Sequence, residues 1–292
     1  MSAMRTIGWL CAMTLAGGVA VRAMATANTA APAPTNSALS AGADLWFPVG
    51  EEIVYKIYWG KIPVAESRAK SEWVEREGRR LIGIRFTTKS NKVLDVLYPV
   101  DDFIESLIDP ETFLPVQFTK RLSEGRYRCH EVTTFDHETG LATYLNKREN
   151  KTKTYPIEAE TRDLISFMYS MRTVDVTVGS AGDFKVMADE KLYDLSIKAL
   201  KEQSVKLPKY GKIASVVLKP VAAFQGLFVR RGSMKIWVSD DDRKIITKAS
   251  IKVPVAHVNL LLEDVSGPGT DQWVADRTER RISPRGSRRI RR

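Results

Sequence analysis

The chain has 292 residues, of which 43% are hydrophobic and 27% are charged, proportions typical of a folded globular protein. Its net charge of +10 arises at the two ends, because the segments before Asn28 and after Asp276 hold ten arginines and one acid. The rest of the chain has 35 basic and 34 acidic residues, which argues against a nucleic-acid-binding protein.

The N-terminus has the three parts of a secretory signal peptide. Arg5 supplies a positive charge, residues 7–21 are apolar or small, and residues 23–27 offer two small-x-small cleavage sites. The apolar run is shorter than the roughly 20 residues of a membrane-spanning helix, although an uncleaved anchor is the alternative. We therefore expect residues 1–27 to be a cleaved signal, residues 28–43 to be a disordered linker and the protein to be periplasmic.

An opening hairpin comes next. Apolar side chains alternate with polar ones from Ile53 to Trp59, the pattern of a half-buried strand. Gly60 marks a turn or bulge. Small residues then alternate with charged ones over residues 65–72, so another element can pack closely against this second strand.

Further strand patterns follow along the chain, separated by turns rich in Gly, Asn and Asp. They lie at residues 81–89, 100–108, 116–122, 127–135, 142–148, 153–157, 184–188, 191–199, 213–220, 232–238, 244–253 and 257–264. Residues 91–98 fit either a short helix or a bent strand. Three acids at Asp240, Asp241 and Asp242 indicate a solvated turn, with a cation site as the alternative. Many short strands predict a mainly antiparallel β fold.

The mature chain would have a single cysteine, Cys129, so no internal disulfide is possible. It lies in the strand predicted over residues 127–135, where a buried cysteine acts as a small apolar residue. We expect it to be buried and inert, and the alternative is a reactive or intermolecular thiol.

One segment, residues 163–171, breaks the β pattern. It has the spacing of a helix and is apolar on nearly all sides, so it must be buried, and Asp163 is a suitable N-cap. The simplest fold is mainly β: a large curved antiparallel sheet, an open barrel or spiral, that encloses this one short helix. Met168 and Met171 could instead line a lipid site.

No sequence motif points to a reaction. The chain has three histidines at unrelated positions and lacks HExxH, CxxC, GxSxG and phosphate-loop motifs. Ser166 has no glycine elbow. Asp101, Asp102 and Glu105 offer the two carboxylates of a glycosidase only if they face one another. We therefore expect a non-enzymatic protein with no metal and no cofactor.

Several short motifs, taken in order, resemble the bacterial family of unknown function DUF3108. They are residues 47–51 (FPVGE), Tyr55 with Trp59-Gly60, Leu97-Tyr98 before Asp101, Leu114-Pro115, residues 163–166 (DLIS) with Tyr169 and Arg172, and residues 236–241 (IWVSDD). The resemblance runs from about residue 47 to residue 265. It implies an exported, largely antiparallel β domain at residues 44–267, with a curved sheet similar in kind to that of lipoprotein carriers. A basic disordered tail at residues 268–292 would follow.

We expect a periplasmic cell-envelope protein that binds a hydrophobic ligand or an envelope protein in or on the curved sheet. Candidate ligand-binding residues are Trp59, Met168, Met171 and Trp237. The alternatives are a hydrolase or modifying enzyme that acts on a cell-wall or lipid substrate, and a structural partner that uses a sheet edge. The Arg-rich tail could bind an anionic membrane surface or be merely solvated.

Overall fold

The computed structural model describes residues 45–222, 234–253 and 256–268. The expected signal peptide and linker, and all but the first residue of the expected tail, lie outside these residues. The described strands and helices are β1 (Glu52–Trp59), β2 (Ile62–Arg76), β3 (Arg79–Ser90), α2 (Lys92–Asp95), β4 (Asp101–Ile108), β5 (Pro115–Glu124), β6 (Tyr127–Asp136), β7 (Leu141–Asn146), β8 (Lys151–Pro156), β9 (Arg162–Asp163), α3 (Leu164–Ser170), the 3₁₀ turn η1 (Met171–Thr173), β10 (Ala181–Ala188), β11 (Lys191–Glu202), β12 (Val205–Leu207), β13 (Gly211–Ile213), β14 (Ser215–Ala222), β15 (Met234–Ser239), β16 (Ile246–Val253) and β17 (Ala256–Ser266).

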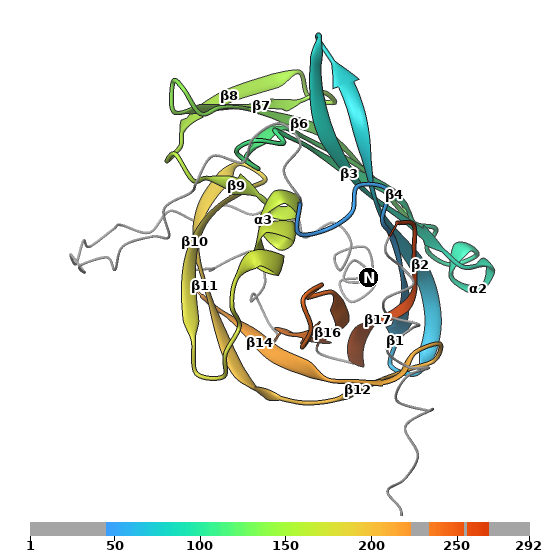
Figure 1. Ribbon diagram of the computed structural model, residues 1–292. Coiled ribbons are helices and arrows are strands. Elements are labelled where there is room, and N and C mark those ends of the chain that lie inside the picture. The colour runs from blue at the N-terminus through green and yellow to red at the C-terminus, as the bar shows by residue number, and fades with distance from the viewer. Residues whose placement is uncertain (1–44, 223–233, 254–255, 269–292) are drawn as a thin grey trace, which may run out of the picture.

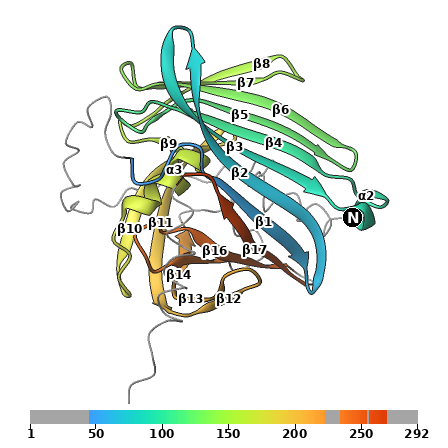
Figure 2. The ribbon, with the colours of Figure 1, turned by 45° about the vertical axis from the view of Figure 1, so that its right-hand side comes forward.

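Fifteen of the described strands form one curled sheet, in the order β8-β7-β6-β5-β4-β3-β2-β1-β17-β16-β15-β14-β11-β10-β9. The short pair β9–β10 is parallel, and the other neighbours are antiparallel. Figure 1 shows the sheet curling around α3, and Figure 2 shows β4–β8 rising above β10, β11 and β14. The two end strands, β8 and β9, do not pair in the described part of the chain. The prediction of an open, curved antiparallel sheet around a short helix is confirmed.

The register of the opening hairpin explains its contrasting patterns. Tyr55 lies opposite Ser67 and Ile53 lies opposite Ala69, so each large side chain of β1 faces a small one of β2. All four residues are buried. β1 also pairs along its other edge with β17, the last described strand. This pairing brings the first and last strands of the domain together. The curled sheet, called the ring below, therefore has one continuous wall on this side.

The helix α3 is buried inside this wall, as predicted. Asp163 caps its N-terminus, and its Oδ1 accepts hydrogen bonds from the backbone N–H groups of Ile165 and Ser166 at 2.7 and 2.9 Å. Its side chains divide between two cores. Leu164 and Phe167 pack with residues of β10 and β11, whereas Ile165 packs with residues of β3, β4 and β5. The helix therefore fills the gap where the two ends of the sheet approach one another.

Polar contacts also hold the two ends of the sheet together. Lys120 of β5 is buried and pairs with Asp189, in the turn between β10 and β11, and with Glu131 of β6 at 2.5 Å. Arg162 of β9 donates a hydrogen bond to the backbone carbonyl oxygen of Phe113. Contacts between side chains thus replace the missing strand pairing on this side.

The structure also tests the local predictions for residues 91–98, for Cys129 and for the three acids that begin at Asp240. Within residues 91–98 the chain forms the short helix α2 (Lys92–Asp95), and the Asn91 side chain caps it by accepting from the N–H groups of Val93 and Leu94. Cys129 is buried, and this burial raises the pKa of its thiol to about 12. The three acids from Asp240 form a turn in which Asp241 accepts two backbone hydrogen bonds. No helix in the described ranges is long and apolar enough to cross a membrane.

Candidate ligand-binding site

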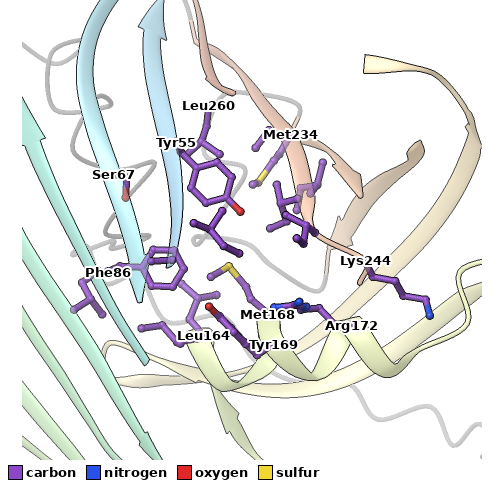
Figure 3. A pocket seen from close by; sticks show the side chains of 18 of the residues that line it. Tyr55, Ser67, Phe86, Leu164, Met168, Tyr169, Arg172, Met234, Lys244 and Leu260 are labelled. Atoms are coloured by element: carbon purple, nitrogen blue, oxygen red, sulfur yellow. The ribbon is translucent and has the colours of Figure 1, made fainter. Parts of the chain in front are cut away.

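A cavity of about 100 Å³ lies between α3 and the inner face of the sheet (Figure 3). Side chains from β1–β5, α3, η1, β15, the β15–β16 loop, β16 and β17 line it. They are Ile53, Tyr55, Ser67, Ala69, Phe86, Ile104, Phe118, Leu164, Ile165, Met168, Tyr169, Arg172, Met234, Ile236, Lys244, Ile245, Ile246, Ala249 and Leu260. Most of this lining is hydrocarbon, so the site suits an apolar molecule.

The cavity exists because small side chains line part of a wide ring. Ser67, Ala69 and Ala249 lie on its wall, where larger residues would fill the space. The helix that enters the ring has only seven residues, from Leu164 to Ser170. A short helix and small wall residues together leave a gap in an otherwise close-packed interior.

Besides Ser67, whose hydroxyl accepts a hydrogen bond from Thr88 at 3.0 Å, four polar side chains interrupt the apolar lining: Tyr55, Tyr169, Arg172 and Lys244. Both tyrosines are nearly fully buried, and this burial raises the pKa of each phenol well above its ordinary value. Each hydroxyl is therefore protonated and can donate a hydrogen bond. The Lys244 side chain is 22% exposed, which places this part of the lining near the protein surface.

Arg172 is held by a buried charged network. Its Nη1 and Nη2 donate to the carboxylate of Glu51 at 2.6 and 3.2 Å, and its Nε donates to the backbone carbonyl oxygen of Arg243 at 2.8 Å. Arg243 Nη2 donates to the same carboxylate at 2.7 Å. The Arg172 guanidinium also lies 5.4 Å from the ring centroids of Phe47 and Tyr169. The network fixes the end of α3 against the start of β1.

Three of the motifs that are distant in the sequence meet at this network. Glu51 ends the motif at residues 47–51, Arg172 follows the α3 motif, and Arg243 follows the motif at residues 236–241. Asp241 accepts a hydrogen bond from the backbone N–H of Arg243 and shapes the turn that presents it. The motifs thus mark residues that position the helix beside the cavity.

At the other end of α3, Asp163 is fully enclosed. Besides the two backbone N–H groups at the start of the helix, its carboxylate accepts a hydrogen bond from the Ser106 hydroxyl of β4. Burial raises the pKa of Asp163 to about 6, against the lowering effect of these hydrogen bonds. The residue joins the helix to the wall and does not line the cavity.

The four candidate ligand-binding residues lie in different places. Met168 lines the cavity (Figure 3), whereas Met171 packs against the core beside β10 and β11. Trp59, at the end of β1, is partly buried against the main core. Trp237 is buried, but side chains alternate along a strand, so it points away from the cavity that its neighbour Ile236 lines.

Sequence reasoning did not select the polar cavity residues for ligand binding, nor Met234 and Ile236. Tyr55, Tyr169 and Arg172 belonged to the family motifs, which was the one available signal for them. Lys244 carried no signal, because its place in the lining depends on how the β15–β16 turn folds.

The carboxylates considered for catalysis do not converge on the cavity. Asp102 and Glu105 lie on opposite faces of β4, since their positions in the strand differ by an odd number. Asp102 is instead buried beside Glu124, and burial raises its pKa to about 6. The Ser166 hydroxyl donates to the backbone carbonyl oxygen of Asp163 at 3.1 Å. Within the described ranges, no cluster of three His, Cys, Asp or Glu residues could hold a metal ion.

Comparison with known families supports the resemblance. The family model of DUF3108, described as a protein of unknown function, matches residues 54–263. The chain belongs to the DUF3108 family. The match covers all or most of every strand that lines the cavity, although it begins after Glu51 and Ile53. No curated protein sequence matches this DUF3108 protein.

Three solved structures with some likeness to this DUF3108 protein have 8–10% sequence identity to it. A β-barrel-like protein of the domain of unknown function DUF1849 from Brucella abortus has a TM-score of 0.47 and 10% identity, over 75% of this chain and 97% of that one. A Bacteroides fragilis protein described as exported, with a YmcC-like fold, has a TM-score of 0.33 and 8% identity, over 75% and 97%. A Parabacteroides distasonis protein described as a lipoprotein has a TM-score of 0.32 and 10% identity, over 76% and 98%.

Proposed function

We propose that this DUF3108 protein binds the hydrocarbon part of a lipid-like molecule, without catalysis, in the cavity between α3 and the sheet. The observation that carries the proposal is an apolar, partly enclosed space in the centre of the fold, lined by a buried helix and by eight of the strands in the described sheet. The motif-bearing network of Glu51, Arg172 and Arg243 fixes the helix beside this space.

The volume of the cavity limits how much of a ligand fits inside it. A cavity of about 100 Å³ is smaller than the roughly 300–1,000 Å³ of typical ligand pockets, so it accommodates only part of an acyl chain. Met168 and Met234 line it, and their unbranched side chains can change conformation at low cost. A longer chain would enter as these two side chains move aside.

The proposal includes a place in the cell envelope. The N-terminal pattern of one basic residue, an apolar run and small-x-small sites supports export across the inner membrane. Hydrophobic ligands that cross the aqueous space of an envelope need a protein that shields them from water. A cavity of this kind would supply that shield.

A titration monitored by NMR tests the proposal. Protein labelled with ¹³C at the methionine methyl groups would be titrated with octane, which offers hydrocarbon alone. We expect the methyl signals of Met168 and Met234 to shift, because both residues line the cavity. The signal of Met187, buried in a different cluster, is the internal control. If none of these signals moves, or if Met187 alone moves, the proposal is wrong.

A further inference from the structure

We infer that the ligand is an acyl chain whose terminal oxygen, in a carboxylate or an ester carbonyl, enters the cavity and accepts hydrogen bonds from Tyr55 and Tyr169 beside Arg172. This inference rests on the proposed function and specifies its ligand. It goes beyond an apolar cavity because the lining contains a buried hydroxyl, that of Tyr169, with no hydrogen-bond partner among the described residues.

Tyr169 is the first donor. The residue is 4% exposed, and its hydroxyl has no hydrogen-bond partner among the described residues. Figure 3 shows the side chain rising from α3 into the space that Met168 also lines. Most buried polar side-chain atoms in proteins have a partner, and an unsatisfied one lowers stability. A bound acceptor would supply the missing hydrogen bond.

Tyr55 is the second donor and comes from the opposite wall. It is 5% exposed and lies on β1, across the cavity from the helix (Figure 3). Burial raises the pKa of this phenol well above its ordinary value, so its hydroxyl keeps a proton to donate. Because Tyr55 and Tyr169 influence one another electrostatically, the two phenols lie in one local environment. Two donors on facing walls can both donate hydrogen bonds to one oxygen-bearing group that lies between them.

Arg172 supplies positive charge at the same end. A guanidinium has five N–H groups, and Arg172 uses three of them on Glu51 and on the backbone of Arg243. Its side chain lines the cavity beside Met168 (Figure 3). Arg172 can only donate hydrogen bonds, and each protonated tyrosine hydroxyl has one hydrogen to donate, so the three together favour an acceptor such as a carboxylate or carbonyl oxygen. The hydrocarbon would then lie along Phe86, Ile104 and Phe118.

Three eight-carbon probes test the inference: octanoic acid, methyl octanoate and octane. Their dissociation constants would be measured from the methyl shift of Met168. We expect the acid, the ester or both to bind at least about tenfold more tightly than octane, the gain that one or two hydrogen bonds supply. Tight binding by the acid alone identifies a free fatty acid carboxylate. Tight binding by both also admits an acyl ester.

Two phenylalanine variants show whether the hydroxyl is responsible. Tyr169→Phe should reduce the advantage of the oxygen-bearing probes by about tenfold. It should leave the melting temperature of the empty protein unchanged or higher, because the hydroxyl it removes is unsatisfied. Tyr210→Phe is the matched control, since that buried hydroxyl accepts from Val265 N–H and donates to Asp264, both at 2.8 Å. The control should lower the melting temperature and leave probe binding unchanged.

The outcomes separate the two proposals. If no probe shifts Met168, the proposed function itself is wrong. If all three probes bind with similar dissociation constants and Tyr169→Phe changes none of them, the hydrocarbon site stands and the inference about its polar end is overturned. If Tyr210→Phe weakens binding as much as Tyr169→Phe does, the effect is a general loss of stability and the inference is also overturned.

Discussion

Replacing Asp163 by asparagine should change how the stability of the domain depends on pH. In the folded protein this carboxyl group is fully buried at the start of α3, and burial raises its pKa to about 6. Asparagine has the same shape. Its oxygen can accept from the N–H groups of Ile165 and Ser166, and its amide can donate to the Ser106 hydroxyl, so the helix cap should survive.

The magnitude follows from the difference between the folded and unfolded pKa values. An unfolded aspartate has a pKa near 4. Each unit of difference between the folded and unfolded pKa values corresponds to about 1.4 kcal/mol of stability. Because the folded value is the higher one, the folded state holds the proton more tightly. Asp163 therefore lowers stability by about 3 kcal/mol above pH 6, and this loss disappears as the pH falls toward 4. Asp163→Asn should stabilise the domain at pH 7.5 and have little effect at pH 4.

Urea unfolding of both proteins between pH 4 and pH 7.5 measures this effect. The difference in unfolding free energy between variant and parent isolates Asp163, because other titrating groups are common to both proteins. These include Asp102, whose pKa burial also raises to about 6, and His130, whose pKa burial lowers. A difference that stays constant with pH, or that grows as the pH falls, would refute the reasoning. The hydrogen bonds from the capping N–H groups would then stabilise the ionised carboxylate by more than burial destabilises it.

Two further substitutions test the network and the cavity. Glu51→Ala removes the carboxylate that Arg172 and Arg243 share, and it should cost about 3–5 kcal/mol in urea unfolding; a loss below about 1 kcal/mol would contradict a structural role. Ala249→Leu should occupy the cavity, weaken octane binding and leave the melting temperature nearly unchanged. Ala142→Leu, in a fully packed core, is the control for Ala249→Leu and should lower the free energy of unfolding by about 1–3 kcal/mol. Equal destabilisation by both leucines would show that no usable space exists beside Ala249.

The sequence predicted the strands well because each long strand has one face in the core. The alternation over residues 257–264, for example, located β17 to within two residues of its ends. It could not give the pairing of β17 with β1, because a periodic pattern does not say which distant strand lies alongside. β12 and β13 were missed, since three residues each are too few for a period to be recognised.

The binding site was harder to predict, for a reason visible in β15. Ile236 and Trp237 are adjacent and both are apolar, so the sequence does not show which of them faces the interior. Trp237 is buried even though it points away from the cavity, in a cluster that includes Val205 and Leu207 of β12. The helix gave a clearer signal, because its apolar surface had to be enclosed, and Met168 does line the cavity.

The most direct test of the central claim is an NMR measurement of contacts between a bound acyl chain and the protein. Octanoic acid would be added to protein labelled at its methionine and leucine methyl groups, and nuclear Overhauser effects from the ligand methylene protons would be recorded. We expect effects to Met168 and Leu260, which line the cavity, and none to Met187 or to Leu192, which is 41% exposed. Effects confined to exposed methyl groups such as that of Leu192 would place the ligand outside the ring and contradict the account.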